Sequence, residues 1–213
     1  IKMKALRRAF SLEEQSDGLA HQEIEYVFYG RLTDLSELHK ASRFEYQEQW
    51  EVKIPQTEQN ITSARMRVRE TITSISSQPT FVHTTKTQSE DQDHPNEVSI
   101  PTTEAHFHQY QLISNNGMIK DRYFFPVVGE GTNEELVWEL DVYYIKGSDP
   151  FSNNYTQWCR LELEVKNPNT PIPPLPIQLE ELISPTKDGY TEEENKKISY
   201  LFEHEFLTSN KHK

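Results

Sequence analysis

HQEIEYVFYG at residues 21–30 and WCRLELEVK at residues 158–166 decide the fold, because each carries a Glu-x-Glu pair inside a strand-like run. Side chains two apart on a strand point to the same face, so each pair places two carboxylates side by side. The residues between them, such as Ile24 and Leu163, point to the other face. Both runs therefore predict strands with one charged face and one apolar face.

Three further runs between these two also alternate charged with apolar residues: Arg65-x-Arg67-x-Arg69, Lys120-x-Arg122 and Glu139-x-Asp141. A closed sheet with a charged interior explains five such strands most economically, because inward and outward residues alternate along every barrel strand. Buried charges without a partner would each cost roughly several kcal/mol. We therefore expect bound ions of both signs to compensate them.

The two sets of charges suit different ions. Clustered carboxylates suit a hard divalent cation, which prefers oxygen ligands. Rows of arginine and lysine suit a polyphosphate, because guanidinium groups match phosphate oxygens in pairs and ammonium groups act as point charges. A metal ion and a chain of phosphates would together neutralise both sets.

Composition narrows the class of protein. The 213 residues favour one domain, or one domain with an appendage, and the low hydrophobic content of 34% agrees with interior positions spent on polar groups. A net charge of −12 argues against a general nucleic-acid binder, so long nucleic acid is expected at most as a 5′-triphosphate end. The sequence leaves the oligomeric state open.

The cellular location is predicted from the absence of a long apolar run and of paired cysteines. It has no run of about 18 apolar residues, so we expect no membrane partner. The single cysteine, Cys159, excludes an intramolecular disulfide and a cysteine-rich metal site, and its alternation with Arg160 predicts a packed thiol on the outer face. We expect a cytoplasmic protein.

Chain patterning predicts an α+β chain built around a barrel of seven to eight mostly antiparallel strands. The strands are expected at 23–30, 43–54, 64–75, 80–87, 118–127, 135–146 and 157–167. An acidic loop is expected at 88–97, a helix at 102–114, and a C-terminal helix opened by a capping box of Thr191 and Glu194. The expected divisions are an arm at 1–20, the main domain at 21–185, and a C-terminal helix and tail at 186–213.

The charged motifs follow one another in a set order: Glu23-Ile24-Glu25, Arg65-Met66-Arg67, Lys86, Lys120/Arg122, Glu139/Asp141 and Glu162/Glu164. In this order and spacing the chain resembles the triphosphate tunnel metalloenzymes, whose bacterial and animal members are grouped as CYTH domains. The resemblance spans roughly residues 21–185. One departure is Val27, which stands where the family carries a lysine; Arg69 or Lys53 would have to replace that charge, or the activity differs.

The resemblance implies an eight-stranded antiparallel β-barrel, or tunnel, with flanking helices. Such a tunnel binds a triphosphate with Mg²⁺ or Mn²⁺ and hydrolyses a terminal phosphoanhydride. Carried over to this chain, the metal ligands would be Glu23, Glu25 and Glu164. The residues that hold a second metal or orient the attacking water would be Glu162, Glu139 and Asp141. The phosphate-binding residues would be Arg65, Arg67, Lys86, Lys120 and Arg122.

Three functions stay open at this point. The leading one is a divalent-metal-dependent triphosphatase that acts on a small triphosphate-containing substrate, either inorganic triphosphate or a nucleoside triphosphate, or on an RNA 5′-triphosphate end. The second is cyclisation of ATP, as in the class IV adenylyl cyclase branch of the same family. The third is a catalytically weakened protein that binds a nucleotide or triphosphate, for which Val27 is the motivating departure.

Overall fold

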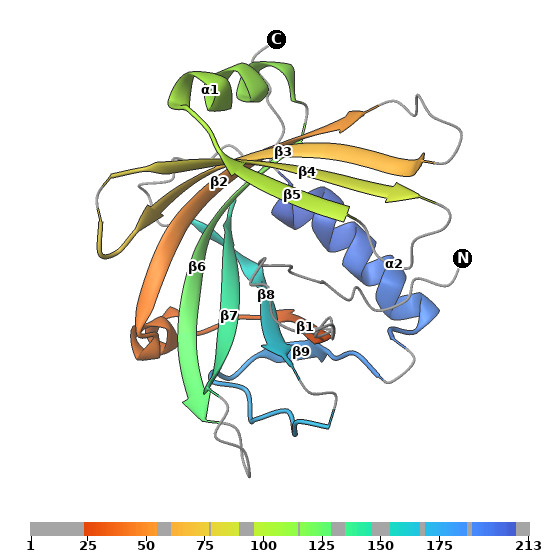
Figure 1. Ribbon diagram of the computed structural model, residues 1–213. Coiled ribbons are helices and arrows are strands. Elements are labelled where there is room, and N and C mark those ends of the chain that lie inside the picture. The colour runs from red at the N-terminus through yellow and green to blue at the C-terminus, as the bar shows by residue number, and fades with distance from the viewer. Residues whose placement is uncertain are drawn as a thin grey trace, which may run out of the picture.

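The computed structural model describes residues 24–54, 61–76, 78–89, 96–114, 116–128, 135–145, 154–166, 169–186 and 189–207. Within these ranges, nine strands form one antiparallel sheet in the order β5-β4-β3-β2-β6-β7-β8-β1-β9 (Figure 1). The strands are β1 (Ile24–Arg31), β2 (Arg43–Ile54), β3 (Ile61–Thr73), β4 (Thr80–Ser89), β5 (Asn96–Pro101), β6 (Asn116–Val128), β7 (Glu135–Tyr144), β8 (Tyr155–Val165) and β9 (Glu180–Ile183). The helices are η1 (Leu35–Lys40), α1 (Glu104–Ile113), α2 (Glu192–Leu201) and the π-helical turn η3 (Phe202–Phe206).

The α+β class and the antiparallel pairing are therefore confirmed, and the strand count differs. Seven to eight strands are expected from the sequence, whereas the sheet has nine. The two that pattern reading misses are the edge strands β5 and β9, of six and four residues. Edge strands are commonly short, so a pattern of four to six residues is hard to separate from a loop.

The register places the charged positions of neighbouring strands directly opposite one another. Such pairs occur from one end of the sheet to the other: Glu25 with Glu164, Asp141 with both Arg122 and Arg160, and Lys86 with both Arg65 and Glu97. Directly opposite residues share a face, so these paired charged side chains of β1 and of β3 to β8 lie on the same side of the sheet, whereas Glu70 of β3 and Asp121 of β6 have the opposite parity. We call this side the charged face.

The other face is mostly apolar and carries the main core, although the buried carboxylate of Asp121 also lies on it and accepts hydrogen bonds from Tyr144 and Tyr155. Trp138, Leu140 and Leu161 are fully buried there, and Leu175, Ile177 and Leu179 of the proline-rich segment pack over them. Cys159 lies in the same core, as expected for a packed thiol, and burial raises its pKa to about 12.

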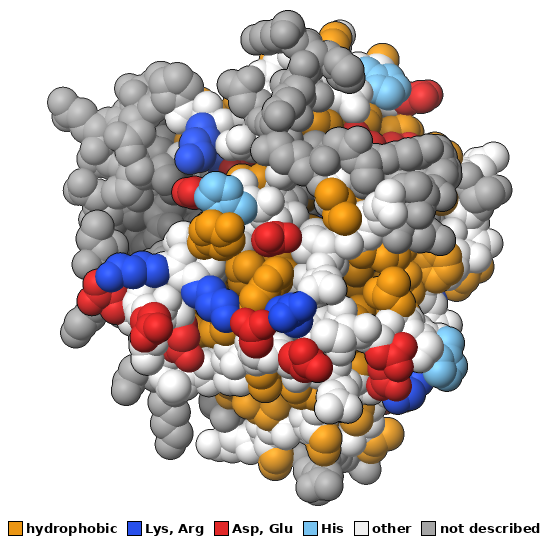
Figure 2. Space-filling view, turned by 180° about the vertical axis from the view of Figure 1, so that it is seen from behind, with side chains coloured by type: hydrophobic (Ala, Val, Ile, Leu, Met, Phe, Trp, Pro, Cys, Tyr) orange, Lys and Arg blue, Asp and Glu red, His pale blue; other side chains and the backbone are white. Residues whose placement is uncertain are grey.

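Helix α1 covers the apolar face of β2 and β3. Thr103 caps its N-terminus by accepting a hydrogen bond from the His106 backbone N–H. Phe107 packs there with Trp50 and Val68. Figure 2 views the molecule from behind, where acidic and basic side chains are interspersed with apolar areas.

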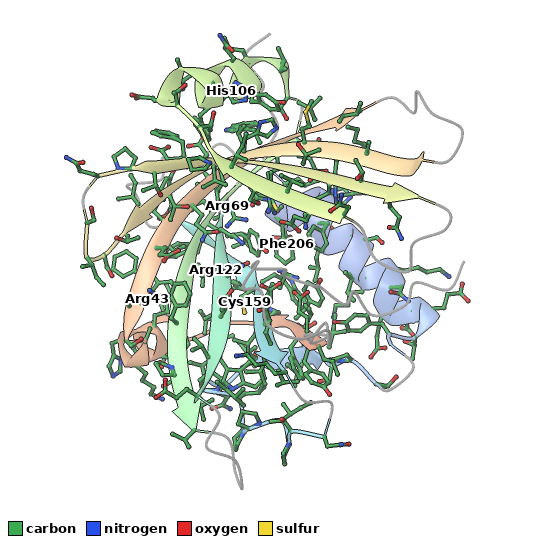
Figure 3. All side chains as sticks on the ribbon, viewed as in Figure 1. Arg43, Arg69, His106, Arg122, Cys159 and Phe206 are labelled. Carbon is green, nitrogen blue, oxygen red and sulfur yellow. The ribbon has the colours of Figure 1, made fainter. Side chains whose placement is uncertain are left out.

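The C-terminal segment lies against the charged face instead. Thr191 and Glu194 form the predicted capping box at the start of α2. The ring of Phe206 stacks on Tyr143 of β7 at 4.0 Å between centroids and also contacts Tyr29 of β1. Figure 3 shows Phe206 on the same side of the sheet as Arg69 and Arg122. The segment therefore forms an apolar boundary to the charged residues.

No helix among the residues just described has the length and apolar character needed to cross a membrane.

Candidate functional site

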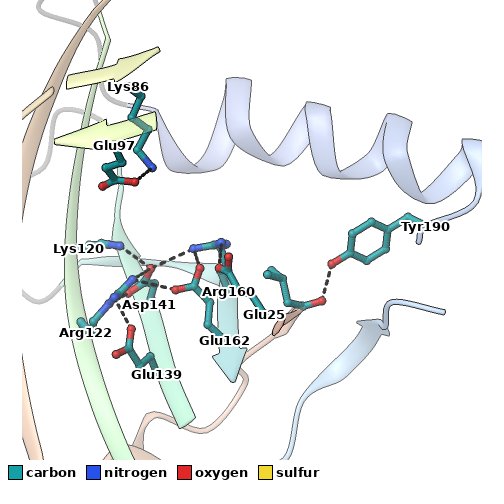
Figure 4. Close-up of polar contacts among 11 residues, drawn as sticks. Glu25, Lys86, Glu97, Lys120, Arg122, Glu139, Asp141, Arg160, Glu162 and Tyr190 are labelled. Atoms are coloured by element: carbon teal, nitrogen blue, oxygen red, sulfur yellow. Dashed lines mark hydrogen bonds and ion pairs between the residues drawn. The ribbon is translucent and has the colours of Figure 1, made fainter. Parts of the chain in front are cut away.

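An ion network lies at the centre of the charged face, around Asp141 of β7 (Figure 4). The Asp141 side chain has no exposed surface. Lys120 Nζ lies 2.5 Å from its Oδ2, and Arg122 donates to both of its oxygens, at 2.6 and 2.8 Å. Strand β6 positions both cations, because they stand two residues apart beside β7.

Arg122 extends the network to two further carboxylates. Its Nη1 donates to Glu139, and its Nη2 lies 3.2 Å from Glu162 Oε2. One guanidinium thus contacts acidic residues of both β7 and β8. Five N–H donors in a rigid fork make arginine suited to such multiple contacts.

The local charges set the protonation of Asp141. Burial by itself raises the pKa of this carboxyl, but Arg122 and Lys120 outweigh burial and hold the pKa below its ordinary value. Asp141 is therefore ionised at neutral pH and binds its two cations as an anion.

Arg160 of β8 joins the network to β1. Its Nη2 lies 3.1 Å from Glu25 Oε1, and its Nη1 contacts Glu162 and lies 3.9 Å from Asp141 Oδ2. The side chain is only 20% exposed, and its Nε has no hydrogen-bond partner among the residues that the structure describes. Arg160 thus contacts carboxylates from three strands.

A second set of contacts lies further along the charged face, on β3, β4 and β5. Lys86 Nζ lies 2.6 Å from Glu97 Oε2, and Arg67 Nη2 lies 3.7 Å from Glu97 Oε1. Arg65 is 46% exposed on its side chain and only approaches Glu51, at 3.9 Å. Among the described residues, the Glu97 carboxylate lies between Lys86 and Arg67, and Glu51 lies near Arg65.

The two sets divide the charged face. We call Glu25, Glu139, Asp141, Glu162 and Glu164, on β1, β7 and β8, the acidic half. We call Arg65, Arg67, Arg69 and Lys86, on β3 and β4, the basic half. Lys120 and Arg122 stand between the halves on β6, where burial and the charge of Arg122 lower the pKa of Lys120, Asp141 opposes them and Arg69 adds a smaller lowering contribution.

A cavity of about 200 Å³ opens at the acidic half. Glu135, Glu139, Glu162 and Glu164 line it, together with Lys166. Carboxylate oxygens are the ligands that hard divalent cations prefer. No three acidic, histidine or cysteine side chains within the described ranges come close enough together to enclose a metal ion. Mg²⁺ at phosphate sites is held by one or two carboxylates plus phosphate oxygens and waters, so these residues fit that mode of binding.

The structure brings together most of the residues that the sequence proposes for the site. Glu25, Lys120, Arg122, Glu139, Asp141 and Glu162 share one network, Glu164 lies opposite Glu25, and Arg65, Arg67 and Lys86 form the basic half. Glu23 lies outside the described residues.

Sequence reasoning missed Arg160 and Glu97. Arg160 has the same strand parity as Glu162 and Glu164, which was a sufficient signal to place it on the charged face. Glu97 fell in a segment read as a loop, so no parity was assigned to it. Arg160 supplies a cation beside Glu25, at 3.1 Å from its Oε1.

Comparisons with known proteins add little. No family model matches the chain, and a search of curated proteins finds no match. Among solved structures, one described as the structure of PH1819 protein from Pyrococcus horikoshii OT3 has a TM-score of 0.39 and 15% identity, covering 86% of this chain and 92% of that chain. At that identity and TM-score, the likeness carries no inference about function.

Proposed function

We propose that the charged face binds a small triphosphate-bearing molecule together with Mg²⁺ or Mn²⁺ and hydrolyses one of its phosphoanhydrides. The observation that carries this proposal is the division of one continuous face into an acidic half and a basic half, joined by Lys120 and Arg122. A metal–triphosphate complex has the same division of charge. In this proposal, strands β1 to β8 form the wall of a tunnel of the kind found in triphosphate tunnel metalloenzymes, to which the motif order is similar.

The basic half would bind the phosphates. Arg67 and Lys86 are largely buried on the charged face, with side chains 14% and 9% exposed, so they offer donors in a site of lowered dielectric. Arg65 is more exposed and would contact the outer end of the phosphate chain. Arg122 and Lys120 are fixed by Asp141 and would stabilise the charge that develops on the transferred phosphoryl oxygens.

The acidic half would hold the cation and position water. Glu25 and Glu164 stand opposite each other on β1 and β8 and would be the described metal ligands. When bound, the cation supplies Lewis acidity and a template for the phosphate oxygens. Glu139 and Glu162 line the cavity at this half, so their carboxylates would accept hydrogen bonds from the attacking water and orient it.

Phosphate release tests the proposal directly. We expect release from inorganic triphosphate or a free nucleoside triphosphate only with Mg²⁺ or Mn²⁺, and faster than from a triphosphorylated RNA, because the net charge of −12 repels a long polyanion. Glu25→Gln and Glu164→Gln should abolish release without unfolding the chain. Full activity of both variants at limiting metal would contradict the metal assignment. Formation of a cyclic nucleotide from ATP would indicate the cyclase alternative.

A binding protein without turnover is the second candidate. The observation that favours it is that Glu25, Asp141 and Glu162 already have cationic partners, and Val27 supplies no lysine on β1. Tight binding of a triphosphate with metal, without release of phosphate from any of the three substrates, would identify this function.

A further inference from the structure

Each half of the charged face contains a residue of the opposite sign that contacts two of its charges. In the acidic half, Arg160 contacts Glu25 and Glu162 and approaches Asp141. In the basic half, Glu97 contacts Lys86 and Arg67. Both come from strands at which the sequence motifs place no such charge.

The contacts of these two residues are those that a ligand would need. A divalent cation at the acidic half requires the carboxylate of Glu25, whose Oε1 lies 3.1 Å from Arg160 Nη2 in the free protein. A phosphate at the basic half requires the donors of Lys86 and Arg67, between which the Glu97 carboxylate lies. Arg160 and a metal ion beside Glu25 repel each other as like charges, so binding of a metal ion favours movement of Arg160 away from Glu25.

We propose that Arg160 and Glu97 are internal counter-ions that stand in for the metal ion and for a phosphate group, and that metal and triphosphate displace them. This inference rests on the proposed function and specifies how that site binds its ligands. Arg160, once released, has a free guanidinium next to the bound triphosphate, and its Nε–H is a further buried donor. Metal and triphosphate therefore bind cooperatively, because the triphosphate supplies the anion that the released Arg160 needs.

The test measures two ligands separately on two variants. Isothermal titration with Mn²⁺ alone and with inorganic triphosphate in the presence of a chelator gives each affinity without turnover. Arg160→Gln should tighten Mn²⁺ binding at least about tenfold, or about 1.4 kcal/mol, and weaken metal-free triphosphate binding. Glu97→Gln should tighten metal-free triphosphate binding by a similar factor and leave Mn²⁺ binding no tighter than in wild type.

Control variants separate this role from a structural one. A residue that only supports the fold would, on removal, weaken both ligands together. Arg31→Gln and Glu181→Gln alter a largely exposed ion pair of 2.9 Å with the same changes in net charge, and both affinities should stay at the wild-type values. Arg160→Lys keeps the charge but lacks the forked contacts, so its Mn²⁺ affinity should fall between those of wild type and Arg160→Gln. This variant also serves if Arg160→Gln fails to fold.

The outcomes distinguish failure of the counter-ion role from failure of the proposed function. Normal binding of both ligands by the wild-type chain, with both variants shifting both affinities in the same direction, overturns the counter-ion role and leaves the proposed function standing. A wild-type chain that binds neither ligand, alone or together, and releases no phosphate overturns the proposed function itself.

Discussion

The acidic and basic halves of the charged face differ in how firmly their charges are held. In the acidic half, Asp141 has no exposed surface and three cations around it, two of them within 2.8 Å. In the basic half, Arg65 is 46% exposed and 3.9 Å from its nearest acidic partner, and Arg67 is 3.7 Å from Glu97. The acidic half is therefore a preformed, buried ion network, whereas Arg65 and Arg67 of the basic half lie further from their acidic partners.

This difference indicates that the two halves contribute to different properties of the protein. Burial makes each contact of the acidic half strong and each loss costly, so its geometry is fixed before a ligand arrives. In the basic half, Arg65 is partly solvated and can adjust to a flexible polyphosphate at small cost, whereas Arg67 and Lys86 are largely buried. Substitutions in the two halves should therefore affect different quantities.

The largest effect should come from removing the anion at the centre of the acidic half. Asp141→Ala leaves Lys120, Arg122 and Arg160 without their shared carboxylate, and the loss of one partner of a buried ion pair typically costs about 3–5 kcal/mol. Chemical denaturation of the chain without ligand measures this change. Arg65→Ala, the matched change in the basic half, should cost no more than about 1 kcal/mol. Equal losses in the two variants would remove the distinction between the halves.

The basic half should be more sensitive in ligand binding than in stability. Arg67→Ala removes a charge-assisted contact to phosphate, worth ~1.5–3 kcal/mol. We expect triphosphate affinity and kcat/KM to fall together by about that amount, while the unfolding midpoint changes little. Arg43→Ala provides a control, since Arg43 lies over the Phe124 ring at 4.0 Å, at the far end of β2 from the basic half. Wild-type kinetics for Arg67→Ala would place this arginine outside the binding site.

The sequence predicts which residues share the charged face, but it does not predict the edge strands. Alternation placed Glu25, Arg67, Arg122 and Asp141 on one face, because strand parity depends only on spacing. The edge strands β5 and β9 were not predicted, because runs of six and four residues are too short for their pattern to stand out from the surrounding loops.

Which charge contacts which other charge also could not be read from the sequence. That depends on the register between strands distant in the chain, such as β1 with β8 and β7 with β8. Arg160 was visible by parity, but its contact with Glu25 needed the pairing of Tyr29 with Arg160.

Acid should weaken the acidic half through Asp141. The folded-state pKa of this carboxyl lies below its unfolded value, so its contribution is fully present above pH of about 4 and is lost as pH falls towards the folded-state pKa. Each unit of difference corresponds to about 1.4 kcal/mol. Denaturation midpoints in a series of acidic buffers should fall less steeply for Asp141→Asn than for wild type. Parallel slopes would show that Asp141 is not held as an anion by its neighbours.

The smallest effect should come from adding a lysine at Val27. This residue lies opposite Glu162 on the charged face, half-buried among apolar side chains of the C-terminal segment, and the Tyr190 hydroxyl donates to its carbonyl oxygen. A lysine stem can pack on those side chains while its ammonium reaches towards the acidic half. Arg160 already supplies a cation beside Glu25, so the added charge is partly redundant.

We therefore expect Val27→Lys to raise metal-free triphosphate affinity by no more than about tenfold, which is about 1.4 kcal/mol. Val27→Met, of similar length without the charge, should leave that affinity unchanged. In the Arg160→Gln background, where the redundancy is removed, Val27→Lys should have a larger effect than in wild type, and the difference is measured by a double-mutant cycle in the same titration. An identical gain in both backgrounds would mean that Arg160 does not fill the position that Val27 leaves without a charge.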